Sequence, residues 1–177
     1  ADVLICQLEI PLETTLEAFR IAKGTPAKSV LTILNPAPAA PLPDELLALT
    51  DILVPNEVEA SMLLDNTPIC GTVQAFEAAH KLRQRGPKSV ITMGKNGAVL
   101  LEDGKEARSF LAQVVQAVDS TGAGDSFVGS LAYFLAAGRS MDDAVQRAIQ
   151  IATRSVLKHG TQTSYPRREE VLDILGE

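Results

Sequence analysis

Short apolar runs alternate with helix-like segments through the first half of the chain, and this alternation restricts the fold more than any other feature. The runs are rich in Val, Ile and Leu, which is typical of strands buried on both faces. We expect strands over residues 3–8, 30–34, 52–54 and 90–93. The spacing of apolar residues predicts helices over residues 12–23, 44–49, 57–64 and 73–85. Strands separated by helices pair in parallel, so we predict an α/β fold: a mainly parallel sheet with helices on both faces.

The pattern changes after residue 93. Asn96-Gly97 lies between two apolar runs, residues 90–93 and 98–101, and this is a strong hairpin signal. Asp103-Gly104 marks a second turn and residues 113–118 resemble a strand, so we expect an antiparallel hairpin at one edge of the sheet. Further helices are expected over residues 122–137, 141–158 and 169–175. No repeat, low-complexity tract or linker interrupts the 177 residues, which predicts one domain.

Charge and composition narrow the class of protein. The chain has 16 Lys and Arg against 22 Asp and Glu, and a net charge of −6 argues against nucleic acid or an anionic membrane surface as the main partner. Cys6 and Cys70 lack the spacing of a metal site or a disulfide framework. Reduced thiols, with no transmembrane run and no signal peptide, predict a cytoplasmic protein.

One segment has the composition of an anion-binding site. Residues 119–127 read Asp-Ser-Thr-Gly-Ala-Gly-Asp-Ser-Phe, where a strand is expected to end and a helix to begin. The backbone N–H groups of Gly122, Ala123 and Gly124 at a helix N-terminus could hold a phosphoryl group, and Asp125 could accept a hydrogen bond from an attacking hydroxyl. The simpler alternative is a glycine-containing loop in which Asp119 or Ser120 caps the helix. The chain has neither a Rossmann nor a P-loop fingerprint.

This segment closely resembles the C-terminal signature of the ribokinase-like (PfkB-type) carbohydrate kinases. Other motifs of that family occur in order along the chain: Gln7-Leu8-Glu9, Asn35-Pro36-Ala37-Pro38-Ala39, Asn56-Glu57-Val58-Glu59, and Thr92 to Gly97. The resemblance implies a ribokinase-like, Rossmann-type αβα sandwich. It also implies phosphorylation of D-ribose to ribose 5-phosphate by ATP, with Mg²⁺ and a monovalent cation, usually K⁺.

The resemblance also implies roles for individual residues. Asp125 would be the catalytic base and would contact the sugar with Glu9, and Gly122, Ala123 and Gly124 would form the anion hole. The implied nucleotide contacts are Asn56, Thr92, Met93, Gly94, Lys95, Asn96, Gly97, Gly124 and Ile149. Glu59 would be tied to Mg²⁺. The implied K⁺ site comprises Asp119, Thr121, Ser155, Lys158, Gly160 and Ser164.

Each motif also has a purely structural interpretation. Asn56 and Glu59 have the spacing of a capping box, Glu9 could be an ordinary acid at a strand end, and Thr92 to Gly97 could be a plain hairpin turn. Ile149 stands where the family often has Asn or His near the adenine, so its aliphatic side chain could pack on the base but would not make a polar contact. Two functional alternatives stay open: a non-catalytic nucleotide-binding fragment, and a kinase for another furanose sugar or a nucleoside.

Length is the largest departure from the family. Its members have an N-terminal portion with the first strands, a lid over the sugar and Gly-Gly-Lys-Gly-type sugar contacts, and none of these precedes Gln7-Leu8-Glu9 here. Residues 1–177 are therefore expected to be the C-terminal part of a kinase domain without its lid, incomplete for activity by itself. The strand over residues 3–8 should have an exposed edge, poorly ordered or paired with a second copy. A homodimer is expected for the complete protein.

Overall fold

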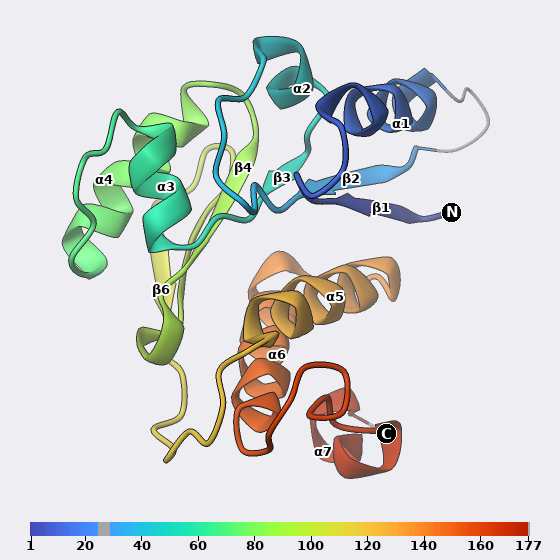
Figure 1. Ribbon diagram of the computed structural model, residues 1–177, viewed down its shortest axis with the longest axis vertical. Coiled ribbons are helices and arrows are strands. Elements are labelled where there is room, and N and C mark those ends of the chain that lie inside the picture. The colour runs from blue at the N-terminus through green and yellow to red at the C-terminus, as the bar shows by residue number, and fades with distance from the viewer. Residues whose placement is uncertain (25–28, 177) are drawn as a thin grey trace. The chain divides into compact units, whose positions relative to one another are not determined.

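The apolar runs form a six-stranded sheet in the order β1-β2-β3-β4-β5-β6 in the computed structural model, which describes residues 1–24 and 29–176 (Figure 1). The strands are β1 (Val3–Cys6), β2 (Leu31–Leu34), β3 (Ile52–Leu53), β4 (Lys88–Thr92), β5 (Ala98–Leu101) and β6 (Arg108–Phe110). The first four pair in parallel, with Ile33 beside Ile5 and Ile52. Because short turns join β4 to β5 and β5 to β6, these strands run antiparallel. The predicted α/β fold, with a mainly parallel sheet and antiparallel edge strands, is confirmed.

Four helices connect or follow the parallel strands. They are α1 (Leu12–Gly24), α2 (Asp44–Ala48), α3 (Glu57–Leu63) and α4 (Thr72–Arg83). All four lie on the same side of the sheet in Figure 1. This follows from the strand order, because right-handed crossovers that always move to the next strand in one direction place every helix on the same face.

Both faces of the parallel sheet are buried, as the apolar runs predicted. Leu34, Leu53 and Ile91 pack with the helices in one apolar cluster that includes Phe19 of α1. Ile33 and Val90 point to the opposite face, because side chains alternate along a strand, and they too are buried. Strands buried on two sides are consistent with the near-continuous apolar runs in the sequence.

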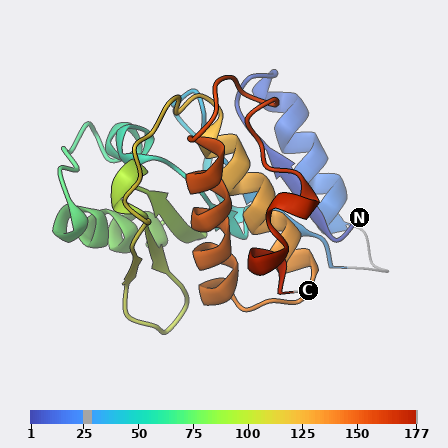
Figure 2. The same cartoon turned by 90° about the horizontal axis from the view of Figure 1, so that it is seen from below.

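The described chain divides into two compact units. That they belong to one kinase domain stays a prediction. The first unit comprises Ala1–Met93 and Val99–Ser109, and the second comprises Gly94–Ala98 and the chain from Phe110 onward. The second contains α5 (Ala123–Ala136), α6 (Met141–Ser155) and α7 (Leu172–Leu175), with short 3₁₀ turns at Gly94–Asn96 and Arg168–Glu170. Helices α5 and α6 pack against each other, and α7 contacts α6 (Figure 2).

The predicted strand over residues 113–118 is wrong. No strand is assigned there, and Val114 and Val118 are exposed. The segment is held at its end by the Val118 N–H, which donates to the Val156 carbonyl at 2.8 Å, rather than by a neighbouring strand. Alternating apolar residues favour a strand only where a free sheet edge is available for pairing. The antiparallel edge strand is β6 instead, a few residues earlier in the chain.

Strand β1 lies at the edge of the sheet and pairs only with β2 among the described residues. This agrees with the exposed edge expected for residues 3–8, although the strand itself is shorter. Whether a second copy covers that edge stays a prediction. No helix in the described ranges has the length and apolar character needed to cross a membrane.

Phe19 tests the apolar cluster. Its side chain is 0% exposed, whereas Ile21 on the same helix is 63% exposed. Phe19→Ala should lower the free energy of unfolding by about 3–5 kcal/mol, because a cavity remains where the ring was. Ile21→Ala should change it by less than about 0.5 kcal/mol. Urea unfolding followed by circular dichroism measures both, and equal effects would contradict this packing.

Candidate functional site

The loops that follow the parallel strands of the first unit meet at the carboxyl edge of the sheet. The Asn35 N–H donates to the Cys6 carbonyl at 3.0 Å, and the Thr92 N–H donates to the Pro55 carbonyl at 2.9 Å. The Leu8 N–H donates to the Ala37 carbonyl at 2.9 Å, which ties the loop before Glu9 to the proline-rich loop. Three predicted site residues, Glu9, Asn56 and Thr92, therefore lie along one edge of the sheet.

Asn56 and Glu59 form the capping box that their spacing indicated. Asn56 is the N-cap of α3, and its Oδ1 accepts from the Glu59 N–H at 2.9 Å. The Glu59 carboxylate accepts from the Asn56 N–H at 2.9 Å and from Asn56 Nδ2 at 2.8 Å. The structural interpretation of this motif is therefore correct. A structural role does not exclude a functional role for Glu59, because the same hydrogen bonds hold its carboxylate in place.

Glu59 is a buried carboxylate. It is 8% exposed, and burial raises its pKa, an effect that the Asn56 N–H partly opposes. Asn35 approaches it as well: Asn35 Nδ2 donates to the Val54 carbonyl at 2.8 Å and lies 3.5 Å from Glu59 Oε2. No Lys or Arg of the described chain forms an ion pair with Glu59. A buried carboxylate without a cationic partner is suited to a hard divalent cation.

The turn after β4 depends on a close backbone approach at Gly97. Its φ is +91°, and a Cβ there would lie 1.8 Å from the Phe110 carbonyl oxygen. The Gly97 N–H donates to the Gly94 carbonyl at 3.1 Å, which closes the turn. Lys95 and Asn96 are exposed at its tip, whereas the Met93 side chain is buried. Of the residues predicted to contact a nucleotide here, Met93 could contribute only its backbone.

In the second unit, α5 begins with free backbone N–H groups. Gly122, its N-cap, has φ of +79° in the left-handed region and no capping side chain. Its carbonyl accepts from the Ser126 N–H at 2.9 Å. Within the described residues, no hydrogen bond occupies the N–H groups of Gly122, Gly124 or Asp125. Gly124 and Asp125 are exposed, and a Cβ on Gly124 would meet nothing within 4 Å. Free N–H groups at an exposed helix start are what an anion hole needs.

Two side chains flank this helix start. Asp125 lies in the first turn of α5 and is exposed. Tyr165 was not predicted, and its hydroxyl oxygen lies 2.8 Å from the position of a Cβ on Gly122. Burial and the charge of Asp125 raise the pKa of Tyr165, so the phenol stays protonated at neutral pH. No spacing signal in the sequence connects Tyr165 with Gly122 and Gly124, which lie 43 and 41 residues earlier in the chain.

Asp119 links the loop before α5 to the loop after α6. Its Oδ1 accepts from the Thr121 hydroxyl at 2.7 Å and from the Thr121 N–H at 2.9 Å, and its Oδ2 accepts from the Gly160 N–H at 3.0 Å. These donors, the Thr121 hydroxyl first, lower the pKa of Asp119 to about 2. Three residues predicted at one cation site are thus brought together.

Other predicted cation-site residues already have partners. Ser155 and Ser164 are buried, and their hydroxyls donate to the Ala152 and Thr161 carbonyls at 2.8 and 2.6 Å. Lys158 Nζ donates to Glu170 Oε1 at 2.6 Å. The described part of the chain holds no cluster of three or more His, Cys, Asp or Glu. A cation here would therefore depend on carbonyl oxygens. Ile149 lies buried in α6, and its role near a nucleotide stays a prediction.

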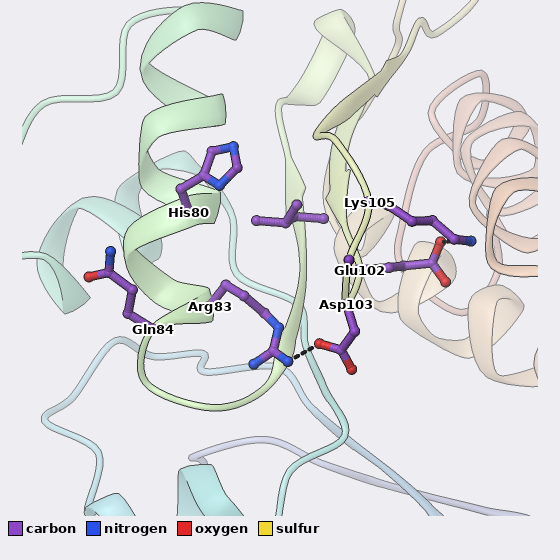
Figure 3. Close-up of a pocket in the computed structure, with 8 residues that line it drawn as sticks. His80, Arg83, Gln84, Glu102, Asp103 and Lys105 are labelled. Carbon is purple, nitrogen blue, oxygen red and sulfur yellow. Dashed lines mark hydrogen bonds and ion pairs between the residues drawn. The ribbon is translucent and has the colours of Figure 1, made fainter.

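A cavity of about 430 Å³ opens elsewhere in the first unit, between α4 and the turn from β5 to β6 (Figure 3). No predicted site residue lines it. Its charged side chains pair with one another: Arg83 binds Asp103, and Lys105 Nζ lies 2.7 Å from Glu102. The charged side chains that line this cavity are therefore already paired with one another.

Comparison with known proteins identifies relatives of the whole chain. The model of the pfkB family of carbohydrate kinases matches residues 2–168. A ribokinase from Staphylococcus aureus (strain COL) is 40% identical over 178 residues, which cover 98% of this chain and 56% of that protein. A ribokinase from Mus musculus is 40% identical over 176 residues, covering 97% of this chain and 53% of that protein.

A comparison of structures also finds a ribokinase. The ribokinase of Arabidopsis thaliana, in complex with ribose and ATP, matches with a TM-score of 0.87 and 31% identity. The match covers 100% of this chain and 56% of that one. The chain therefore spans about half the length of the relatives it matches.

Gly97 and Gly104 provide a matched test of the close approach at the turn. Both have positive φ, but a Cβ on Gly104 would meet nothing within 4 Å. Gly97→Ala should lower the free energy of unfolding by about 3 kcal/mol or more, because the methyl group would overlap the Phe110 carbonyl. Gly104→Ala should cost about 1 kcal/mol, from backbone conformation alone. Denaturant unfolding of both variants checks this, and equal costs would refute the close approach.

The lowered pKa of Asp119 predicts a pH-dependent contribution to stability. A carboxyl group whose pKa is about 2 in the folded protein, against an ordinary pKa of 3.8, stabilises the fold above pH 3.8 and loses that effect as the pH falls towards 2. Asp119→Asn replaces one of the two acceptor oxygens with an NH₂ group, so the side chain can no longer accept from both Thr121 and the Gly160 N–H. It should lower the melting temperature at neutral pH, by an amount that shrinks below pH 3.8.

Melting curves of wild type and Asp119→Asn at several pH values measure this difference. Asp65→Asn is the control, because Asp65 is exposed and has a left-handed φ of 55° that asparagine also adopts readily. A deficit of Asp119→Asn that does not depend on pH would show that the charge of Asp119 contributes nothing.

Proposed function

Because the chain belongs to the pfkB family of carbohydrate kinases, we propose that it takes part in transferring the γ-phosphoryl group of ATP to D-ribose, giving ribose 5-phosphate and ADP. The observation that carries this proposal is the start of α5, where free backbone N–H groups and the exposed carboxylate of Asp125 lie in one helical turn. Relatives named ribokinase at 40% identity support ribose as the acceptor.

The geometry supports a division of roles in phosphoryl transfer. The free N–H groups of Gly122, Gly124 and Asp125, together with the helix dipole, would bind the oxygens of the phosphoryl group as its charge spreads during transfer. Ala123, which lies between them, would hold this backbone in place. The Asp125 carboxylate would accept the proton of the attacking sugar hydroxyl and orient it in line. These groups need no basic side chains.

We assign the nucleotide and the metal to the same residues as the resemblance does. Asn56 and the turn from Thr92 to Gly97 would contact ATP, and Ile149 would pack near the base. Glu59 fits Mg²⁺, because it is buried, lacks an ion-pair partner and is fixed by Asn56. When bound, Mg²⁺ would neutralise charge on the phosphates. Asp119, Thr121 and Gly160 form the best-defined part of the proposed K⁺ site, where loop carbonyls would supply most ligands.

The identity of the sugar rests on relatives more than on this chain's own contacts. Glu9 is exposed beyond β1, and its carboxylate could accept hydrogen bonds from sugar hydroxyls. A second acceptor is favoured by one relative, a deoxyribokinase from Salmonella typhi that is 34% identical over 176 residues. Parallel assays with D-ribose and 2-deoxy-D-ribose distinguish the two. We further propose that the complete protein is a cytoplasmic homodimer whose other partners are small molecules.

Asp125→Asn tests the base. The amide keeps the shape of the carboxylate but cannot accept the sugar proton, so kcat should fall by about 10²–10⁴-fold. The KM for ATP should change little. A coupled assay of ADP release with ATP, Mg²⁺, K⁺ and D-ribose measures this, with Asp65→Asn as a control that should match wild type. Turnover by Asp125→Asn at the wild-type rate would exclude the assignment.

The same assay tests whether this chain acts by itself. Turnover of D-ribose by the folded 177-residue chain would support phosphoryl transfer and remove the non-catalytic alternative. Absence of turnover, together with measurable ATP binding, would overturn catalysis by this chain alone and favour the nucleotide-binding alternative.

A further inference from the structure

Tyr165 lies against the start of α5 without being part of any motif. Its hydroxyl oxygen would be 2.8 Å, and its Cε1 3.3 Å, from a Cβ on Gly122. The phenol therefore rests on the glycine that opens the anion hole. Gly122 has two reasons to lack a side chain: its φ of +79° and the presence of this ring.

The position of Tyr165 is fixed by its neighbours in the chain. Ser164 is buried, and both its N–H and its hydroxyl donate to the Thr161 carbonyl, at 3.0 and 2.6 Å. The Cα of Thr161 lies 3.4 Å from the same Cβ position on Gly122, so this turn packs directly on the glycine. Pro166 follows and restricts the backbone of Tyr165 to extended conformations. The phenol is thus held over Gly122 by a rigid turn.

The hydroxyl has no hydrogen-bond partner among the described residues. It lies beside Gly122, whose N–H also lacks an acceptor among the described residues, so two donors are available at one place. The nearby charged group is the Asp125 carboxylate, which acts on the phenol electrostatically without a hydrogen bond to it. Free donors beside a carboxylate suit an acceptor-rich ligand, and a tetrahedral phosphoryl group is such a ligand.

We infer that the Tyr165 hydroxyl is a further catalytic donor, which forms a hydrogen bond to an oxygen of the phosphoryl group held at Gly122 to Asp125. This inference rests on the proposed function, because it adds a donor to the same phosphoryl-transfer site. In addition to the backbone N–H groups, one side chain would then donate a hydrogen bond to the phosphoryl oxygens. Hydrogen bonds to charged groups are the stronger ones, so the contribution should be measurable.

The chain offers a matched pair of variants for the test. It has two tyrosines and no tryptophan, so Tyr165→Phe and Tyr133→Phe each remove one hydroxyl and keep the ring. Tyr133 lies on α5 and is 48% exposed. With D-ribose and ATP, Tyr165→Phe should lower kcat about 10-fold or more with a KM for ATP within about two-fold of wild type. Tyr133→Phe should match wild type.

A second measurement does not require turnover. In Tyr133→Phe the tyrosine emission comes from Tyr165 alone, so addition of inorganic phosphate should change it. By calorimetry, Tyr165→Phe should bind inorganic phosphate about 10-fold more weakly than Tyr133→Phe does. Melting curves of the two variants establish that both are folded.

The outcomes separate this inference from the proposed function. Failure of Asp125→Asn to reduce turnover would reject the base while the phosphate measurements still decide the role of Tyr165. Equal phosphate affinity in the two tyrosine variants, or no phosphate binding by wild type, would overturn the inference. So would a lower kcat in Tyr165→Phe with unchanged phosphate affinity, because the hydroxyl would then position Asp125 instead of contacting the phosphoryl group.

Discussion

All strands of a parallel sheet end at the same edge, and this constraint determines where the loops of the first unit lie. Because β1 to β4 pair in parallel in sequence order, the loops after Cys6, Leu34, Leu53 and Thr92 leave along the same side. Hydrogen bonds between those loops then hold Asn35, Asn56 and Glu59 in mutual contact. Residues more than 20 positions apart in the chain therefore become neighbours through the fold itself, and no bound ligand is needed to bring them together.

The proposed site in the second unit differs, because backbone N–H groups rather than side chains form most of it. The chain has a net charge of −6, yet the start of α5 presents free N–H groups and the positive end of a helix dipole. The net charge of the chain therefore does not describe the local electrostatics at this helix start. Glycine is required at Gly122 by its left-handed φ of +79° and by the nearby ring of Tyr165, whereas a Cβ on Gly124 would meet nothing within 4 Å.

Much of this arrangement could be predicted from the sequence, because the spacing of apolar residues and the residue types of turns are short-range signals. The parallel strands, the turn at Gly97 and the capping box at Asn56 all have short-range signals. The prediction of a strand over residues 113–118 was wrong. Its apolar pattern is a short-range signal, whereas strand formation also needs a partner strand from elsewhere in the chain. The burial of Met93 and Ile149, and the contact of Tyr165 with Gly122, depend on packing between distant segments, for which a single sequence has no short-range signal.

The carboxylate of Asp119 has a consequence for how the second unit opens. Its bond to the Gly160 N–H joins residues 41 positions apart, and the Val118 N–H bond to the Val156 carbonyl lies beside it. Together they clasp the two ends of the α5–α6 hairpin. Either helix can fray at that end only if the clasp is released, so the amide hydrogens of Val118 and Gly160 should exchange with solvent as one cooperative group. The start of α5, where we propose the anion hole, would then open in one concerted step and not by gradual loosening of its glycines.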